Sequence, residues 1–241
     1  MRSLKKYIGV VIFILVSCSV FAQKEGVSWQ KLNESSNRLQ GKLTGRVYYI
    51  SGEANRSFLY PNDWVKGDIL LANGDKFENL ELRYEADKDE LIVYNANNFT
   101  LFFVEKELVK SFTFKNGDKI QKFIKLSNVR DSARDNYFEE LYCGARSFLA
   151  FHYIFEHKVS PYVDRNGVMR DSEYLQQTNY FMYSEKDGMR KMDINRRSIL
   201  NAFPDRKKEI KKLFRKNHLL IQNEEAMIFA FRLLEENNII N

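Results

Sequence analysis

The chain has three histidines, so metal or acid–base chemistry through imidazole has few places to occur. They are His152, His157 and His218. His152 and the pair Glu156-His157 approach the spacing of an inverted zinc-hydrolase motif but hold one residue too many. On a strand, residues 152 and 157 point to opposite faces, and on a helix they lie about 140° apart. The two histidines therefore cannot bind one metal ion, and we interpret them as ordinary strand residues.

Nucleophilic chemistry has one candidate beyond the N-terminal segment, Cys143. Its surroundings, Leu141-Tyr142-Cys143-Gly144-Ala145, match no protease signature, so we interpret Cys143 as an inert thiol in a sheet. The sequence also lacks a Gly-x-Ser-x-Gly elbow, a Gly-rich phosphate loop and a dinucleotide-binding fingerprint. Without these motifs, the sequence predicts neither a catalytic residue nor a cofactor.

Acidic residues offer two further kinds of chemistry, calcium binding and glycoside hydrolysis. Asp164 to Gly167 has the residue types of a calcium loop, but the Gly comes too early and no Glu follows at the twelfth position. This segment therefore predicts a hairpin turn. Carboxylate pairs that hydrolyse glycosides have no local signature, so a hydrolase remains the alternative function. The candidate carboxylates are Asp87, Asp89, Glu90, Glu139 and Glu140.

The most marked charge feature is a basic stretch from Arg190 to Asn217, with eleven Lys or Arg against Asp193, Asp205 and Glu209. On a helix most of these cations lie opposite an apolar face, which predicts a solvated outer surface. The same face is the best candidate for weak contact with an anionic lipid or glycan. Nucleic acid is not expected, because no aromatic-interleaved RNA motif is present. The candidate face consists of Lys207, Lys208, Lys211, Lys212, Arg215 and Lys216.

The first 22 residues predict export. Arg2, Lys5 and Lys6 precede an apolar run from Tyr7 to Val16. This run is shorter than the roughly 20 residues needed to span a bilayer, and no second run of that length follows. We therefore expect a periplasmic protein or one associated with the outer membrane or cell surface, without a transmembrane helix.

Two processing routes are open for this segment. The small residues up to Ala22 suit an ordinary signal cleavage before Gln23. Leu15-Val16-Ser17-Cys18 resembles a bacterial lipobox, in which Cys18 receives a lipid. Removal of residues 1–22 takes away three cations and no anion, so the net charge falls from +6 to +3. Cys143 then stands alone, and the fold must depend on its hydrophobic core.

The rest of the chain predicts an α+β fold in one domain. Residues 23–40 are polar and are interpreted as a leader or tether, followed by a domain over residues 41–241. Residues 41–195 are expected to be mainly β, forming an antiparallel sheet or open barrel, because they contain short alternating runs separated by turns. The first seven expected strands are Lys42–Ile50, Gly67–Ala72, Phe77–Ala86, Glu90–Asn95, Thr100–Val104, Leu108–Phe114 and Lys119–Leu126.

Turn residues divide the expected sheet. Asn73-Gly74 and Asn116-Gly117 predict hairpins with two-residue loops, because these loops need positive φ angles. Residues 137–159 predict two paired strands broken at Cys143-Gly144, since the aromatic density favours strand over helix. Tyr180–Glu185 and Met189–Ile194 predict a further hairpin.

The hydrophobic period changes from 2 to 3.6 near Arg197, which predicts a C-terminal helical hairpin over residues 197–237. Pro204 suits the first turn of one helix, whose apolar face would hold Ile210, Leu213 and Phe214. Asn223 can cap a second helix. Its apolar positions are Met227, Ala230, Phe231 and Leu234.

Several segments together resemble uncharacterised exported proteins of Bacteroidota. They are Phe21-Ala22-Gln23, Trp64-Val65-Lys66-Gly67-Asp68-Ile69-Leu70-Leu71, the two Asn-Gly turns, and Phe203-Pro204-Asp205-Arg206-Lys207-Lys208-Glu209-Ile210. The resemblance implies export and supplies no activity or catalytic residue.

The sequence therefore favours a non-catalytic binding or interaction protein of the cell envelope. The expected partner is an envelope protein, an anionic lipid or a glycan. The alternative is a secreted hydrolase acting on glycans or peptides. The interaction class leads because no Ser-His-Asp, Cys-His or metal-ligand spacing marks an active site.

Overall fold

The computed structural model describes residues 43, 45–48, 59–95, 100–126, 135–165 and 167–240. The predicted signal segment 1–22, with Cys18 and the Ala22-Gln23 junction, and the predicted leader 23–40 lie outside the described residues. In chain order the elements are β1 (Gly45–Val47), β2 (Leu59–Leu71), β3 (Lys76–Glu85), β4 (Glu90–Asn95), β5 (Thr100–Val104), β6 (Val109–Asn116), β7 (Lys119–Leu126), β8 (Asn136–Tyr142), β9 (Ser147–Val163), β10 (Met169–Ser184), β11 (Gly188–Met192), α2 (Arg196–Ala202), the 3₁₀ helix η3 (Pro204–Arg206), α3 (Lys207–Lys216) and α4 (Glu224–Glu236).

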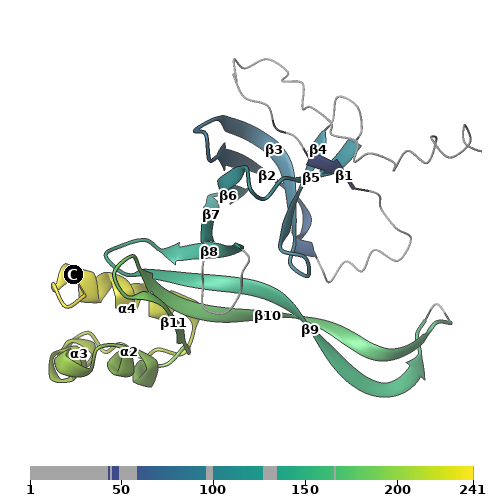
Figure 1. Ribbon diagram of the computed structural model, residues 1–241. Coiled ribbons are helices and arrows are strands. Elements are labelled where there is room, and N and C mark those ends of the chain that lie inside the picture. Colours follow the sequence, from purple (N-terminus) through teal and green to yellow (C-terminus); the bar gives the residue numbers. More distant parts are fainter. Residues whose placement is uncertain are drawn as a thin grey trace, which may run out of the picture.

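The strands form one open, eleven-stranded antiparallel sheet in the order β1-β5-β4-β3-β2-β6-β7-β8-β9-β10-β11. Most neighbours in the sheet are also neighbours in sequence, as expected for a chain of hairpins. The helices follow the last strand and lie together at one end of the β8–β11 region (Figure 1). The predicted α+β class, with a mainly antiparallel sheet before C-terminal helices, is confirmed at this level.

The β1–β7 part of the sheet curls around its own core. Tyr84 on β3 and Phe123 on β7 have ring centroids 5.8 Å apart, although β2 and β6 lie between these strands. In a flat sheet, three strand spacings would separate the two positions by about 14 Å. The curled face encloses the first hydrophobic cluster, which includes Tyr84, Phe112, Phe123 and Tyr137.

Both Asn-Gly hairpins are present, but neither is a loop made of Asn and Gly alone. Asn116 pairs with Lys119, so the β6–β7 loop is Gly117-Asp118, with Gly117 at φ 60° in the first position. This positive φ suits a type II′ turn. In the β2–β3 turn, Leu71 N–H donates to Asp75 O at 2.9 Å, which encloses three residues. Gly74 there has φ 94°.

The expected C-terminal hairpin of two helices is not confirmed. The described residues contain three α-helices and η3 in this region. Asn195 caps the unexpected helix α2, because its side chain accepts a hydrogen bond from Ser198 N–H at 2.8 Å. Pro204 begins η3, which runs directly into α3. The predicted apolar positions Ile210 and Phe214 are buried.

The helices pack on the face of the sheet that carries Phe148, Tyr180 and Met182. These side chains join the helical residues in the second hydrophobic cluster. Phe148 stacks on Phe231 of α4, with ring centroids 5.1 Å apart. The helices therefore cover one face of β8–β11.

Strands β9 and β10 extend far beyond the positions that their other neighbours pair. β9 and β10 pair with each other along most of their length. On the side away from β10, β9 pairs with β8 only through residues 148–150. On the side away from β9, β10 pairs with β11 only through residues 180–184. The remaining residues form a two-stranded ribbon that reaches away from the sheet and helices (Figure 1). From residue 151 to 163 it spans roughly 40 Å. Strand structure at 160–163 and 169–179 was not predicted from the sequence.

Candidate functional site

His152 lies at the centre of a polar cluster that crosses four strands, β7 to β10. Its Nε2 is 2.7 Å from Glu139 Oε2 on β8, and its Nδ1 is 3.0 Å from Thr178 Oγ1 on β10. Gln121 Nε2 donates to the other Glu139 oxygen at 2.9 Å. The strand register produces this arrangement, since His152 pairs directly with Thr178 and Glu139 pairs with Ala150, two residues from His152. We call Gln121, Glu139, His152 and Thr178 the polar seam.

The polar seam lies between the two hydrophobic clusters. Phe123 and Ile154 pack with the first cluster, whereas Phe148 and Tyr180 pack with the second. Glu139 is almost fully buried there. Because a buried carboxylate requires hydrogen-bond donors, Gln121 and His152 satisfy a group that would otherwise destabilise the fold.

The surroundings of Glu139 and Glu224 shift their pKa values in opposite directions. Burial alone would raise the pKa of Glu139, but hydrogen bonds from His152 and Gln121 hold it below its ordinary value. Burial and the nearby Glu139 charge raise the pKa of Glu224. Burial and Glu224 also raise the pKa of Tyr180 to about 12. Two neighbouring carboxylates therefore differ in acidity: Glu139 loses its proton more easily than an ordinary Glu, and Glu224 keeps its proton more easily.

The seam has the order of groups found in acyl-transfer sites. A carboxylate oxygen only accepts hydrogen bonds, so His152 Nε2–H donates to Glu139, and in the tautomer with its proton on Nε2 the Nδ1 atom can accept from Thr178 Oγ1–H. A carboxylate, an imidazole and a hydroxyl in this order can activate a nucleophile. Sequence reasoning named Glu139 and His152 but missed their contact and Thr178.

His157 and Cys143 stand apart from this cluster. His157 is exposed on the ribbon, and its position has the opposite parity to residue 152, as the strand geometry predicts. Cys143 is exposed. Burial of part of the thiol and the Glu140 carboxylate raise its pKa, which lowers its thiolate fraction and its nucleophilicity. Among the described residues, no group of three His, Cys, Asp or Glu could hold a metal ion.

Three of the other four candidate carboxylates have structural partners. Asp89 accepts hydrogen bonds from Tyr84 Oη and Lys106 Nζ and from Tyr137 N–H at 3.2 Å, which ties the β3–β4 turn to β8. Burial raises the pKa of Asp89, although these bonds oppose the shift. Glu140 pairs with Lys122 at 2.6 Å. The remaining two are Asp87, which is exposed, and Glu90, which pairs with Arg46 at 3.1 Å.

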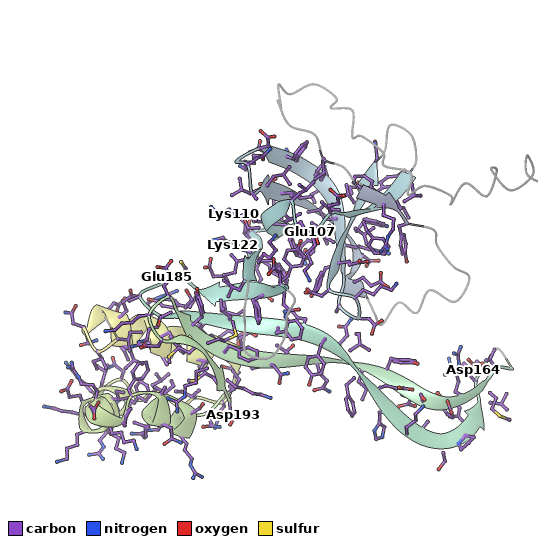
Figure 2. All side chains as sticks on the ribbon, viewed as in Figure 1. Glu107, Lys110, Lys122, Asp164, Glu185 and Asp193 are labelled. Atoms are coloured by element: carbon purple, nitrogen blue, oxygen red, sulfur yellow. The ribbon has the colours of Figure 1, made fainter. Side chains whose placement is uncertain are left out.

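Asp164 forms the predicted turn at the tip of the ribbon (Figure 2). Its Oδ1 accepts from Val168 N–H at 3.0 Å, and its Oδ2 accepts from Arg170 Nε at 3.0 Å. Gly167 has φ 78°. Both carboxylate oxygens therefore serve the hairpin.

The predicted basic face lies on α3, opposite the buried Ile210 and Phe214. Five of its six cations are exposed, and Lys207 is partly exposed. Arg206 pairs with Glu209 at 2.8 Å. Within the described chain, no acidic side chain forms an ion pair with the six candidate cations, which are Lys207, Lys208, Lys211, Lys212, Arg215 and Lys216.

The ribbon carries exposed apolar side chains that the sequence analysis did not identify. Of the ten large hydrophobic side chains exposed in the described part of the chain, seven lie between residues 155 and 175. Met169 is 73% exposed and Val163 is 62% exposed. Concentrated apolar exposure of this kind marks interaction sites. The seven residues are Phe155, Tyr162, Val163, Val168, Met169, Tyr174 and Leu175.

Comparison of the chain with protein-family models, with curated proteins and with solved structures finds no match. Among the helices of the described residues, none combines the length and apolar character needed to cross a membrane.

Proposed function

We propose that this protein is an exported, non-catalytic interaction protein of the cell envelope, which binds a partner protein through the β9–β10 ribbon. The observation that carries the proposal is the concentration of exposed apolar side chains on residues 155–175. Export rests on the N-terminal sequence, with its basic start, its short apolar run and its resemblance to exported proteins of Bacteroidota.

The ribbon has little support of its own. An isolated two-stranded hairpin is marginally stable in water, and stable sheets need at least a third strand or a packed face. Residues 155–158 and 160–163 are exposed on β9, as are residues 173–177 on β10. A partner that covers these side chains would supply the missing packing, which supports binding as the role of the ribbon.

Site-specific photo-crosslinking in the native cells tests this proposal. The photoreactive residue p-benzoylphenylalanine replaces Leu175 on the ribbon or, as a matched control, Ile120 at the β6–β7 hairpin. Both side chains are large, apolar and exposed. We expect one discrete crosslinked partner from position 175 and none from position 120. The same products from both positions, or no product from position 175, would overturn the proposal.

The polar seam favours one alternative, a hydrolase acting on glycans or peptides. In that function Thr178 would be the nucleophile, His152 the base and Glu139 the residue that orients the ring. The test compares the purified chain with Thr178→Val on activated ester, peptide and glycan substrates. Hydrolysis that is lost in Thr178→Val, while the melting temperature is unchanged, would favour the hydrolase. Equal rates in both proteins would remove Thr178 from consideration.

A further inference from the structure

The outer edge of β10 is open along the ribbon. β11 pairs with residues 180–184, and no described strand pairs with the outer side of residues 169–179. An unpaired edge of this length offers backbone N–H and C=O groups to another strand. A binding surface of this kind selects an extended segment, which adds to the sheet through main-chain hydrogen bonds.

The outer edge of β9 is less suitable. The register shifts near Asp171, so that residues 159–161 of β9 lie opposite this one residue. The shift is a bulge, and bulges interrupt regular pairing. Pro161 also lies within it and lacks an N–H group. Since both features protect sheet edges, β10 provides the better edge for an added strand.

One face of β10 has a distinct charge pattern along this edge. Met169, Asp171, Glu173 and Leu175 alternate in sequence and therefore share a face. Leu175 pairs across the ribbon with Phe155, and Met169 pairs with Val163. The face thus carries two carboxylates between two apolar pairs.

These carboxylates form no ion pair in the described part of the chain, although Asp171 accepts a hydrogen bond from Ser172 Oγ at 3.1 Å and its charge acts on Lys158. On the other face, Lys158 contacts Glu156 at 2.8 Å and Ser172 at 2.9 Å. Arg170 there binds the turn residue Asp164. In the described part of the chain, neither Asp171 nor Glu173 forms an ion pair. A strand bound beside β10 would therefore meet Glu173 without an ion pair and Asp171 with only partial compensation of its charge.

We infer that the β10 edge binds an extended segment of the partner protein, with two Lys or Arg at alternate positions flanked by apolar residues. This inference rests on the proposed function. The partner's cations would lie opposite Asp171 and Glu173, and its apolar side chains would lie near Met169 and Leu175. Opposite charges directly across two strands stabilise the pairing, whereas like charges destabilise it.

A second copy of the chain is a poorer occupant of the charged part of this edge, residues 170–174. Two copies that paired antiparallel along β10 would be related by a two-fold axis. Because directly paired residues point to the same face of the sheet, this axis must pass through one residue of β10 and not between two residues. An axis at residue 170, 171, 172 or 173 places like charges opposite each other. An axis at Tyr174 places each Glu173 opposite Leu175.

A palindromic peptide tests the inference, because it can pair in either strand direction. The probe is acetyl-Leu-Thr-Lys-Thr-Lys-Thr-Leu-amide, and its matched control has Glu in place of both Lys. The full chain is titrated with each peptide at low salt, and amide hydrogen exchange is followed over residues 169–179. We expect the Lys peptide to bind about tenfold more tightly, because two favourable pairs replace two repulsive ones.

Charge reversal should exchange this preference. Asp171→Lys with Glu173→Lys is expected to bind the Glu peptide better than the Lys peptide. Glu107→Lys with Glu185→Lys makes the same change in net charge on exposed residues away from the ribbon (Figure 2). This control is expected to keep the original preference. Hydrogen exchange in each free variant verifies that the ribbon remains folded.

Equal binding of the two peptides, or protection outside residues 169–179, would overturn the inference. Dimerisation of the free chain through the ribbon would also overturn it, in favour of a second copy. Position 175 could still crosslink to an envelope protein in either case. The proposed function would then stand, while the chemistry assigned to the partner segment would fall.

Discussion

His152 connects three neighbouring strands through its two ring nitrogens. The contact with Glu139 on β8 and the contact with Thr178 on β10 both lie between the hydrophobic clusters. A buried polar group costs free energy unless it is paired, and paired groups of this kind restrict the register of the strands that carry them. The simplest role of the seam is therefore to hold the curled sheet and the helical end in one register.

Glu139→Gln should weaken the fold in a pH-dependent way. Because the pKa of Glu139 is lowered in the folded state, its charge stabilises the protein above the unfolded-state pKa of about 4.3. This contribution is lost as the pH falls through the lower folded-state value. Urea unfolding should show wild type more stable than the variant at pH 7, with a smaller difference at pH 3. A difference independent of pH would contradict the role of the charge.

Glu224→Gln should show the opposite dependence. Burial and Glu139 raise the pKa of Glu224, so ionisation of Glu224 destabilises the fold as the pH rises above about 4.3. The variant should therefore gain stability relative to wild type as the pH rises above this value. Glu225→Gln is the matched control, since it is exposed in the same first helical turn. The same gain in both variants would indicate a helix-dipole effect instead.

At the scale of elements, the helices depend on specific caps. Asn223 accepts a hydrogen bond from Ala226 N–H at 2.9 Å at the start of α4. At the end of α3, His218 has φ 50° and Leu219 N–H donates to Phe214 O at 2.9 Å. This is the Schellman arrangement, in which a residue with positive φ ends the helix. The end of α4 repeats it at Asn238, with φ 54°.

Asn223→Ala should destabilise the protein by about 1 kcal/mol, because the variant loses a side-chain N-cap. Asn223→Ser should retain most of the stability, since a Ser hydroxyl can accept the same hydrogen bond. Chemical denaturation of the three proteins at pH 7 measures both differences. An unchanged midpoint for Asn223→Ala would show that α4 is held by packing on β8 and β9 alone.

The basic face of α3 should bind anionic membranes weakly, as the sequence predicts. Lys207→Ala with Lys211→Ala and Arg215→Ala removes half of the six cations that form it. We expect less co-sedimentation of this variant with anionic vesicles at low salt. The difference should disappear near 1 M salt, where the Debye length is about 3 Å. Equal binding by both proteins, or equal binding to neutral vesicles, would remove α3 as a lipid-binding surface.

At the scale of the molecule, the ribbon and the helices lie at opposite ends of the β8–β11 region (Figure 1). The hydrophobic clusters lie in the curled sheet and beneath the helices, whereas residues 155–175 contribute to neither. Regions with few buried apolar contacts contribute little to global stability. The ribbon is therefore expected to contribute little to the free energy of unfolding of the rest of the protein.

Removal of the ribbon should leave the fold intact. Ile154 and Gln176 are direct cross-strand partners, so an Asn-Gly loop can replace residues 155–175. We expect the melting temperature to change by no more than a few degrees, and no crosslinked partner to form at the shortened hairpin. Cooperative unfolding at a much lower temperature would show that the ribbon supports the core.

The local sequence pattern was sufficient to predict those elements whose structure is decided by short-range contacts. β4, β5 and β7 have the predicted bounds, because each is a short run rich in apolar and β-branched or aromatic residues and is flanked by polar turn residues. Asn223 also caps the predicted helix. In contrast, α2 was not predicted, since its seven residues carry a weak period and end before Pro204. The two Asn-Gly hairpin loops differ in length because the pairing of the flanking strands decides which residues remain in each loop.

The seam and the ribbon depend on contacts between residues far apart in the sequence. Glu139, His152 and Thr178 were separate residues of three polar types until the register of β8, β9 and β10 brought them together. Residues 160–163 and 169–179 contain Pro161 and several charges, which weaken the strand pattern. They form strands because β9 and β10 pair with each other from the turn at Asp164. Sequence alone thus determined the mainly β and C-terminal helical regions, whereas non-local pairing decided which side chains are buried together and which are left exposed.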